Sequence, residues 1–339
     1  MRAVIVDGPG SMRVGEWATP RPAPGDVLVS VAACGICAGD LHIYHGRNPY
    51  ASYPQICGHE IAGVVADLGG DVTGLAAGDH VVVEPFLGCG TCYPCRIGRR
   101  NCCAALQIIG VTRPGGCAEA LVAPVENVHR VPAGVPLSAA ALAEPLAIAV
   151  QACRRGEVRA GELVLILGCG PIGLALIEVA RARGARIVAA DLIASRLDTA
   201  AMMGADAWLA DEHLLPRVLD LTDGEGAPVV IEATGSVGAI EQTVDLVASG
   251  GRIVIVGLIK EGLTARFPAL DFTRKEMTIV GSRASLNCFP ESLQLLATGT
   301  LLLPKIAAEF DLWDAPGVFA EMSANPSFIH KGVLVREMT

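Results

Sequence analysis

The residues best suited to chemistry in this 339-residue chain lie between Cys37 and Glu60. The stretch begins with Cys37-Ala-Gly-Asp-Leu-His42 and ends with Gly58-His59-Glu60. It offers a thiolate, an imidazole and a carboxylate, which are donor types that Zn²⁺ accepts. Three protein ligands leave the fourth position of a tetrahedral zinc open, as in a catalytic site. The alternative is that Cys37 and His59 are unrelated residues of a small β-rich domain.

Further cysteines predict a second metal site of a different kind. Cys89, Cys92 and Cys95 are spaced as two C-x-x-C steps, and the adjacent pair Cys102-Cys103 follows after a turn. Four thiolates close a tetrahedral site and leave no position for water, as in a structural zinc site. Spacing alone allows either member of the pair as the fourth ligand. An iron–sulfur cluster or disulfides are the alternatives, but the spacing and the expected reducing compartment favour zinc.

Glu144 is an acid inside an apolar segment, residues 138–153, that predicts two helical pieces. The second is expected to begin at Pro145, since proline suits the first helical position. Burying a carboxylate alone is costly, so Glu144 should be paired or bound to a metal. The alternative is that it caps the following helix.

The strongest pattern in the second half is a dinucleotide-binding motif. A continuous apolar strand over 163–167 leads into a G-x-G-x-x-G turn and a helix over 174–182, and a second strand ends at Asp191. The glycines allow a pyrophosphate to approach the helix N-terminus, and an acid roughly 20 residues further on binds the ribose hydroxyls. The residues of this turn expected to contact the cofactor are Gly168, Gly170, Pro171, Ile172 and Gly173.

Asp191 predicts NAD as the cofactor, because its carboxylate would repel the 2′-phosphate of NADP. Arg196 could accommodate that phosphate or lie along the adenine. Later strands, near Trp208 and over 229–233, 252–256 and 277–280, follow in doubly wound order, and ligands bind at the carboxyl ends of such strands. The residues expected there are Thr234, Val256, Gly257, Leu258, Ser282 and Arg283. Arg283 is either a cofactor contact or a surface charge.

The fold class is α/β with two domains, since chains longer than about 250 residues divide into separate cores. We predict a mostly β catalytic domain over 1–150 with the cysteine lobe at 88–104. A doubly wound parallel-sheet (Rossmann) domain follows over 151–288. Residues 289–339, with a helix over 291–297 and a final strand over 331–335, are expected to rejoin the first domain.

Composition excludes several classes of partner. The net charge is −9, and the only basic cluster is 96–100, so no nucleic acid or anionic membrane surface is expected. The longest apolar run, 163–177, is shorter than the ~18 residues that indicate a membrane span. The N-terminus reaches an acid and a turn too early for a signal peptide, which predicts a cytoplasmic protein.

Taken in order, these motifs resemble the zinc-dependent medium-chain alcohol dehydrogenases over essentially the whole chain. The matching features are Cys37 with His42 five residues on, Gly58-His59-Glu60, the cysteine lobe, Glu144-Pro145 and the nucleotide fingerprint. Residues 144–146 resemble the sorbitol and threonine dehydrogenase branch. Residues 101–103, 109–111 and 281–283 are more similar still to bacterial sugar-acid dehydrogenases of the L-galactonate type.

The resemblance implies a GroES-like catalytic domain and two zinc ions per chain. Cys37, His59 and Glu60 would hold the catalytic zinc, with Glu144 coordinating directly or through the bound water. Cys103, rather than Cys102, would complete the structural site. The resemblance also implies hydride transfer from an alcohol to NAD, His42 as a proton-relay residue, and a homodimer or homotetramer joined through the edge of the nucleotide domain.

One residue departs from the family pattern. The relay of this family begins with a serine or threonine hydroxyl two residues after the cysteine, and here that residue is Gly39. Water, Tyr44, His45 or a substrate hydroxyl would have to replace it, so we expect a polyhydroxylated substrate: a polyol, sugar or sugar acid. The alternatives are an L-threonine 3-dehydrogenase-like enzyme and a non-catalytic zinc- and NAD-binding relative whose relay has decayed.

Overall fold

The computed structural model describes residues 1–325 and 328–338. It divides into two compact units, the first formed by residues 1–147 and 285–339 and the second by residues 148–284. No helix within the described ranges combines the length and apolar character needed to cross a membrane.

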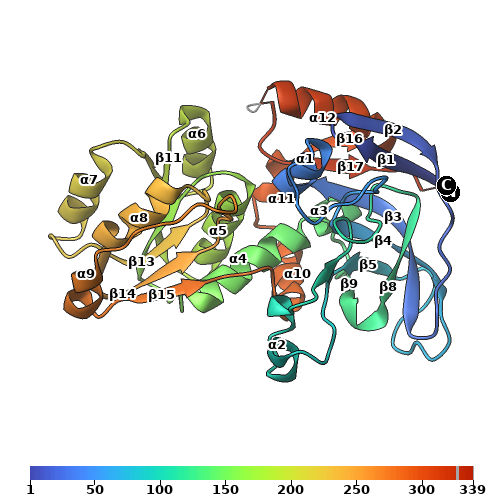
Figure 1. Cartoon of the computed structure of the whole chain (residues 1–339), viewed down its shortest axis with the longest axis horizontal. Helices are drawn as coiled ribbons and strands as arrows, with labels where there is room; N and C mark the ends of the chain where they lie inside the picture. Colours follow the sequence, from blue (N-terminus) through green and yellow to red (C-terminus); the bar gives the residue numbers. More distant parts are fainter. Residues whose placement is uncertain (326–327, 339) are drawn as a thin grey trace. The chain divides into compact units, whose positions relative to one another are not determined.

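A mixed sheet of seven strands forms the first unit (Figure 1). Its order is β16-β17-β3-β4-β5-β9, with β8 also paired to β3. The bounds are β3 (Asp26–Ile36), β4 (Glu60–Leu68), β5 (His80–Val83), β8 (Ala120–Pro124), β9 (Val128–Arg130), β16 (Ala308–Asp311) and β17 (Gly332–Val335). Two smaller sheets are β1 (Arg2–Gly8) with β2 (Ser11–Glu16), and β6 (Phe86–Leu87) with β7 (Gln107–Ile108).

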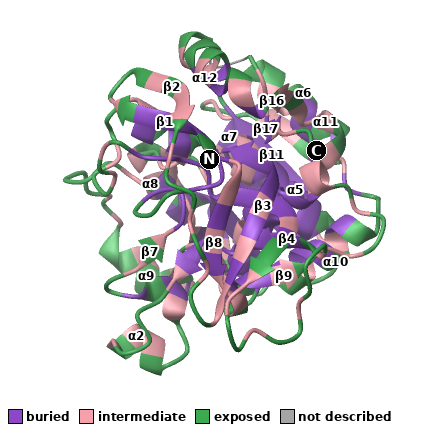
Figure 2. Ribbon diagram, turned by 90° about the vertical axis from the view of Figure 1, so that its right-hand side faces the viewer, coloured by how far each residue is buried: buried purple, intermediate pink, exposed green. Residues whose placement is uncertain are grey.

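Short helices connect these strands. They are α1 (Ala38–Tyr44), α2 (Tyr93–Arg96), α3 (Leu137–Ala140), α10 (Phe289–Ala297), α11 (Leu303–Ile306) and α12 (Ala315–Ala324), with 3₁₀ turns η1 (Arg100–Cys102), η2 (Val125–Asn127) and η3 (Leu312–Asp314). The core lies against the central strands, and Figure 2 shows β3 and β4 largely in the colours of buried and half-buried residues. Val29, Val31 and Val65 are among its buried side chains. The end of β3 and the start of β4 are therefore firmly held.

The second unit is built on a six-stranded parallel sheet in the order β12-β11-β10-β13-β14-β15. Its strands are β10 (Leu163–Leu167), β11 (Arg186–Asp191), β12 (Asp206–Leu209), β13 (Ala227–Glu232), β14 (Val247–Ile255) and β15 (Thr278–Gly281). The helices are α4 (Ala143–Arg155), which begins before residue 148, α5 (Pro171–Ala182), α6 (Ala194–Met202), α7 (Leu214–Leu221), α8 (Val237–Leu246) and α9 (Ala269–Lys275). The strand order reverses between β10 and β13, as in dinucleotide-binding sheets.

Several predicted bounds were wrong by a few residues. α4 begins at Ala143 instead of Pro145, so Glu144 lies in the first turn of the helix. α5 begins at Pro171 instead of Leu174. Proline is tolerated there because the N–H group that it lacks would have no intrahelical partner in the first turn. α10 begins at Phe289, two residues before the predicted start. In the tail, α11, β16 and α12 were not predicted.

Candidate active site

Three predicted metal ligands come together in the first unit. One ligand atom from each of Cys37, His59 and Glu60 lies within 4.8 Å of the others. Cys37 directly follows β3, Glu60 opens β4, and the antiparallel pairing of these strands places Gly35 opposite Glu60. A thiolate, an imidazole and a carboxylate at this separation fit Zn²⁺.

The Glu60 carboxylate occupies space that a glycine provides. A Cβ atom on Gly35 would lie 1.9 Å from Glu60 Oε2, so no larger residue fits without moving the carboxylate. Oε2 is buried and has no hydrogen-bond partner among the described residues. A buried oxygen without a hydrogen-bond partner, beside a thiol and an imidazole, fits the role of a metal ligand.

Lys331 holds the other oxygen of Glu60, and sequence analysis missed it. Its Nζ donates to Glu60 Oε1 at 2.5 Å and to the carbonyl oxygen of Ile36 at 2.9 Å. The side chain is completely buried because β17, which begins at Gly332, pairs with the end of β3. Burial alone would lower the pKa of Lys331, but the Glu60 carboxylate and the Cys37 thiolate raise it, so Lys331 is a cation. The signal in the sequence was only a lysine at the edge of an apolar strand.

Asp40 is a second buried group that sequence analysis left without a role. Its carboxylate accepts the N–H of Cys37 at 2.9 Å and that of Gly58 at 3.0 Å, and it lies 3.4 Å from His59 Nδ1. Burial would raise the pKa of Asp40, but His59 and these two N–H groups hold it below its usual value. Asp40 therefore joins the two ligand segments and orients the imidazole, as carboxylates behind metal-binding histidines do.

The charges around this group suit a cation. Burial would lower the pKa of His59, but the Asp40 carboxylate and the Cys37 thiolate hold it well above its usual value. Burial raises the pKa of Glu144 to about 7, and repulsion by Glu60 adds to the effect while His59 opposes it. Glu144 is buried but is not part of the three-residue ligand group. The anionic groups that favour a proton on His59 would equally favour a bound Zn²⁺ in place of that proton.

Gly39, at the position of the expected relay hydroxyl, has room for a side chain. A Cβ atom on Gly39 would lie 3.5 Å from His59 Cε1 and 3.9 Å from Cys37 Sγ, which are ordinary contacts. His42 is on α1 and is exposed to solvent. His45 Nε2 lies 3.1 Å from the hydroxyl of Ser323 on α12, and Tyr44 packs edge-on against Phe319.

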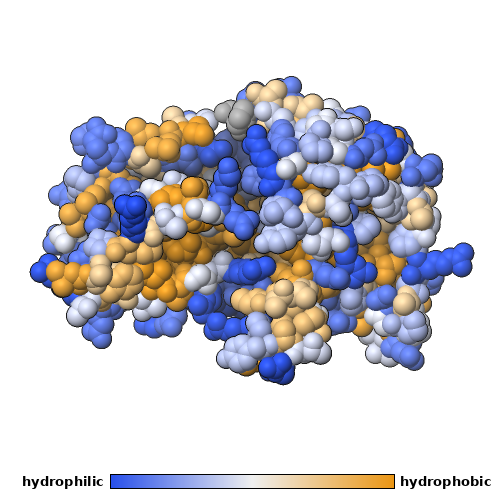
Figure 3. Space-filling view, viewed as in Figure 1, coloured by the Kyte–Doolittle hydropathy of each residue, from blue (hydrophilic) through white to orange (hydrophobic). Residues whose placement is uncertain are grey.

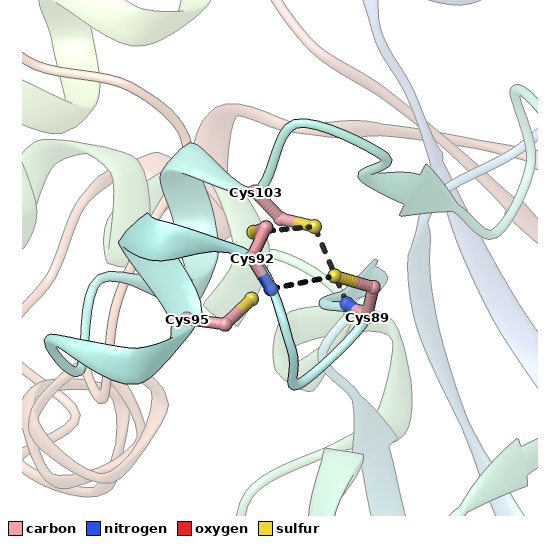
Figure 4. Close-up of side chains that lie close together, drawn as sticks. All are labelled: Cys89, Cys92, Cys95 and Cys103. Atoms are coloured by element: carbon pink, nitrogen blue, oxygen red, sulfur yellow. Dashed lines mark hydrogen bonds between the residues drawn. The ribbon is translucent and has the colours of Figure 1, made fainter.

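The four lobe cysteines also come together (Figure 4). Ligand atoms of Cys89, Cys92, Cys95 and Cys103 all lie within 4.8 Å of one another, whereas Cys102 is exposed and outside the group. The sulfurs of Cys92 and Cys103 are 3.7 Å apart, close to the ~3.8 Å between ligands at 2.3 Å from a tetrahedral zinc. The N–H groups of Cys92 and Thr91 lower the pKa of Cys89 to about 5, which favours the thiolate form that binds zinc.

The fingerprint turn of the second unit has the backbone that phosphate binding needs. Gly168 has a φ of +100°, and a Cβ atom on Gly173 would lie 1.9 Å from the carbonyl oxygen of Gly168. Gly170 is the N-cap of α5, and Pro171 is its first residue. The free N–H groups of this helix end can face an anion.

Asp191 ends the neighbouring strand β11 and is nearly buried. Its two oxygens accept the N–H groups of Cys169 and Ile193 at 2.8 and 2.9 Å, and Arg196 lies 3.7 Å away. The remaining predicted cofactor residues follow the carboxyl ends of β13, β14 and β15: Thr234, Val256, Gly257, Leu258, Ser282 and Arg283. They lie at the edge where α/β sheets bind nucleotides.

Two family models match the chain. The alcohol dehydrogenase GroES-like domain matches residues 23–133, and the zinc-binding dehydrogenase model matches residues 171–298. A zinc-type alcohol dehydrogenase-like protein of Haemophilus influenzae is 36% identical, with 96% of each chain covered. L-Galactonate-5-dehydrogenase of Escherichia coli is 37% identical, covering 89% of this chain and 88% of that protein. L-Threonine 3-dehydrogenase of Pyrococcus horikoshii is 38% identical, covering 83% of this chain and 82% of that protein.

Solved structures agree with these matches. The alcohol dehydrogenase RspB of Escherichia coli, crystallised with NADH, superposes with a TM-score of 0.92 at 31% identity and 99% coverage of both chains. A zinc-binding dehydrogenase of Sinorhizobium meliloti, bound to NADP, has a TM-score of 0.88 at 30% identity and 98% coverage of both.

The chain therefore belongs to the zinc-type medium-chain alcohol dehydrogenase family, and it is an oxidoreductase. The predicted family, the α/β fold class with its GroES-like and Rossmann parts, and the prediction of an alcohol-oxidising enzyme are confirmed.

Proposed function

We propose that this protein oxidises a secondary alcohol of a polyol, sugar or sugar acid and transfers the hydride to NAD. The observation that carries the proposal is the group of half-buried Cys37 with buried His59 and Glu60, in a chain that also has a complete dinucleotide fingerprint. The carbinol C–H would leave as hydride to the nicotinamide and the hydroxyl would lose its proton, giving a ketone and NADH. The twelve cysteines are all free in the part of the chain that the structure describes, which favours a reducing compartment such as the cytoplasm.

Each group of residues has a part in this reaction. Cys37, His59 and Glu60 would hold the catalytic zinc, which when bound polarises the substrate hydroxyl and lowers its pKa. Asp40 keeps the imidazole oriented, and Lys331 holds one oxygen of Glu60. Cys89, Cys92, Cys95 and Cys103 would hold a second, structural zinc.

A substrate panel tests the proposal. NADH formation should be fastest with polyols and sugar acids and at least about tenfold slower with simple alcohols, because a substrate hydroxyl must replace the missing relay oxygen. L-Threonine belongs in the panel, since a threonine dehydrogenase is among the relatives. Oxidation of L-threonine alone would favour that alternative. Zinc and NADH binding without turnover of any alcohol would favour a non-catalytic relative.

Gly39→Ser should restore a hydroxyl at the first relay position. The space beside His59 accepts a side chain without a clash. We expect the kcat for simple alcohols to rise about tenfold, while polyol oxidation changes less, because general acid–base assistance contributes 10²–10⁴-fold when complete. Gly39→Ala, which fills the same space without a hydroxyl, is the matched control. Equal rates for both variants and the wild type on every alcohol would show that Gly39 does not limit the reaction.

Asp191→Asn should weaken the preference for NAD. Removing the charge leaves Arg196 without its carboxylate partner and free to meet a 2′-phosphate. We expect kcat/KM for NADP to rise about tenfold and that for NAD to fall by a similar factor, the effect of one charged hydrogen bond. The exposed Asp198 on α6 supplies the control Asp198→Asn. A ratio of NAD to NADP activity that is the same in both variants would contradict the role of Asp191.

The free edge of the nucleotide sheet supports a homodimer or homotetramer. β15 is one of the two edge strands of this sheet, with β12 at the other edge, and exposed strand edges readily pair with another chain. Leu263, Leu270 and Phe272 are 53%, 57% and 41% exposed nearby in the chain, and Figure 3 shows apolar side chains at the surface where α9 and β14 lie. Light scattering should give at least twice the chain mass, and Val280→Lys on β15 should give monomers. A monomeric wild-type protein would contradict this assembly.

A further inference from the structure

Glu232 joins the loops that the proposed function assigns to the cofactor. It is the last residue of β13, completely buried, and no sequence motif gave it a role. Its carbonyl oxygen accepts the N–H groups of Val256 and Gly257 at 2.9 and 3.1 Å. Its Oε1 accepts the N–H groups of Thr234 and Gly235 at 2.6 and 2.9 Å, and also the Thr234 hydroxyl. One residue thus ties together the ends of β13 and β14.

These loops pack backbone against backbone. A Cβ atom on Gly168 would lie 2.8 Å from the Thr234 methyl group, and one on Gly235 would lie 2.5 Å from the carbonyl oxygen of Leu258. A Cβ atom on Gly257 would lie 2.1 Å from the Gly235 nitrogen. Movement of the 233–235 turn would therefore be transmitted to the fingerprint loop and to the 256–258 loop.

Glu232 also lies at the point where the sheet changes direction. It pairs with Leu167, the residue before Gly168, and the next N–H along the chain, that of Ala233, donates to the Leu167 carbonyl at 2.8 Å. The strand order reverses between β10 and β13, and nucleotides bind at this reversal.

A purely structural role at the buried position of Glu232 would favour an uncharged side chain. Its carboxyl group makes no salt bridge within the described residues, and its Oε2 is buried without a hydrogen-bond partner. Burying such a group destabilises a fold unless another advantage offsets the cost. A carboxylate oxygen accepts several N–H and O–H donors at once, and charged acceptors form stronger hydrogen bonds than neutral ones.

We propose that Glu232 is a positioning residue for the dinucleotide. Its carboxylate fixes the 233–235 turn and the 256–258 loop against Gly168, and so sets the affinity for the cofactor without contacting the alcohol. The inference rests on the proposed NAD-dependent function of the same unit.

Glu232→Gln tests the inference, with Glu178→Gln as the matched control. Glu178 is also a completely buried carboxylate of the second unit, but it lies within α5 and pairs with Arg181 at 3.1 Å. NADH binding is measured by fluorescence titration, and KM for NAD, kcat and the thermal midpoint are measured beside it. Glu232→Gln should raise the Kd for NADH and the KM for NAD about tenfold, with kcat at saturating NAD within about twofold of wild type. Glu178→Gln should leave both constants within about twofold of wild type.

The outcomes separate positioning from simple stability. An unchanged Kd in Glu232→Gln, or equal increases in both variants, would overturn the inference and leave Glu232 a structural residue. If Glu232→Gln does not fold, Glu232→Asp keeps the charge but withdraws the oxygen from its donors, and the same rise in Kd is expected. A wild-type protein that binds no NADH would overturn the proposed function itself.

Discussion

Cys37→Ser should lower kcat/KM for the best alcohol by at least about 10³-fold, because a bound metal supplies several kcal/mol of transition-state stabilisation. The hydroxyl of serine is a poor zinc ligand, so one of the two zinc ions per chain should be lost with the activity. NADH binding, which depends on the second unit, should change by less than about twofold. Activity assays, metal analysis and NADH titration on the same preparation measure all three.

Two other cysteines provide the controls for Cys37. Cys102→Ser, which changes an exposed cysteine outside both ligand groups, should retain two zinc ions and full activity. Cys92→Ser should also lose one zinc, but from the lobe. A Cys37→Ser protein that keeps both zinc ions and wild-type activity would contradict the assignment of Cys37, His59 and Glu60 as the catalytic metal site.

Lys331→Met should destabilise the first unit more than any surface substitution. It removes the cation that pairs with Glu60 in a completely buried position. Breaking a buried ion pair by removing one partner costs about 3–5 kcal/mol, since the other charge remains buried and unpaired. For a unit of this size the thermal midpoint should fall by roughly 10 °C. Scanning calorimetry or circular dichroism measures it.

A double variant isolates the charge pair from the packing of the lysine stem. Lys331→Met combined with Glu60→Gln leaves no buried charge unpaired, so it should regain most of the stability that Lys331→Met loses. Lys331→Arg keeps the charge and should be less destabilising. A Lys331→Met protein that melts within about 2 °C of wild type would show that the pair with Glu60 contributes nothing to stability.

Much of the fold follows from local sequence patterns. The apolar strand over 163–167, the glycine turn and Asp191 predict a strand, a helix and a second strand without information from elsewhere in the chain. The elements after residue 289 were harder to predict. α12 and β16 pack as part of the first unit, but residues 303–324 have no fingerprint and only a weak pattern of apolar residues. Their structure depends on long-range contacts that local patterns do not encode.

The candidate site likewise contains some residues that local motifs predict and others that they do not. Metal ligands and fingerprint residues stand in short motifs with characteristic spacing, so Cys37, His59 and the lobe cysteines could be predicted, although their roles as ligands stay predictions. Lys331 could not, because it lies 271 positions from Glu60 and meets it only through the pairing of β17 with β3. Glu232 was missed for a similar reason. Its importance comes from loops that are brought together by the parallel sheet.

Removing and restoring the metal tests the central claim most directly. The protein would be treated with a chelator and assayed for NADH formation with its best polyol or sugar acid, before and after stepwise addition of Zn²⁺. If Cys37, His59 and Glu60 hold the catalytic zinc, the metal-free protein should still bind added NADH but should not produce NADH from NAD and the alcohol. Activity should return in proportion to the zinc bound. Full alcohol oxidation by protein shown to be free of metal would contradict a zinc-dependent dehydrogenase.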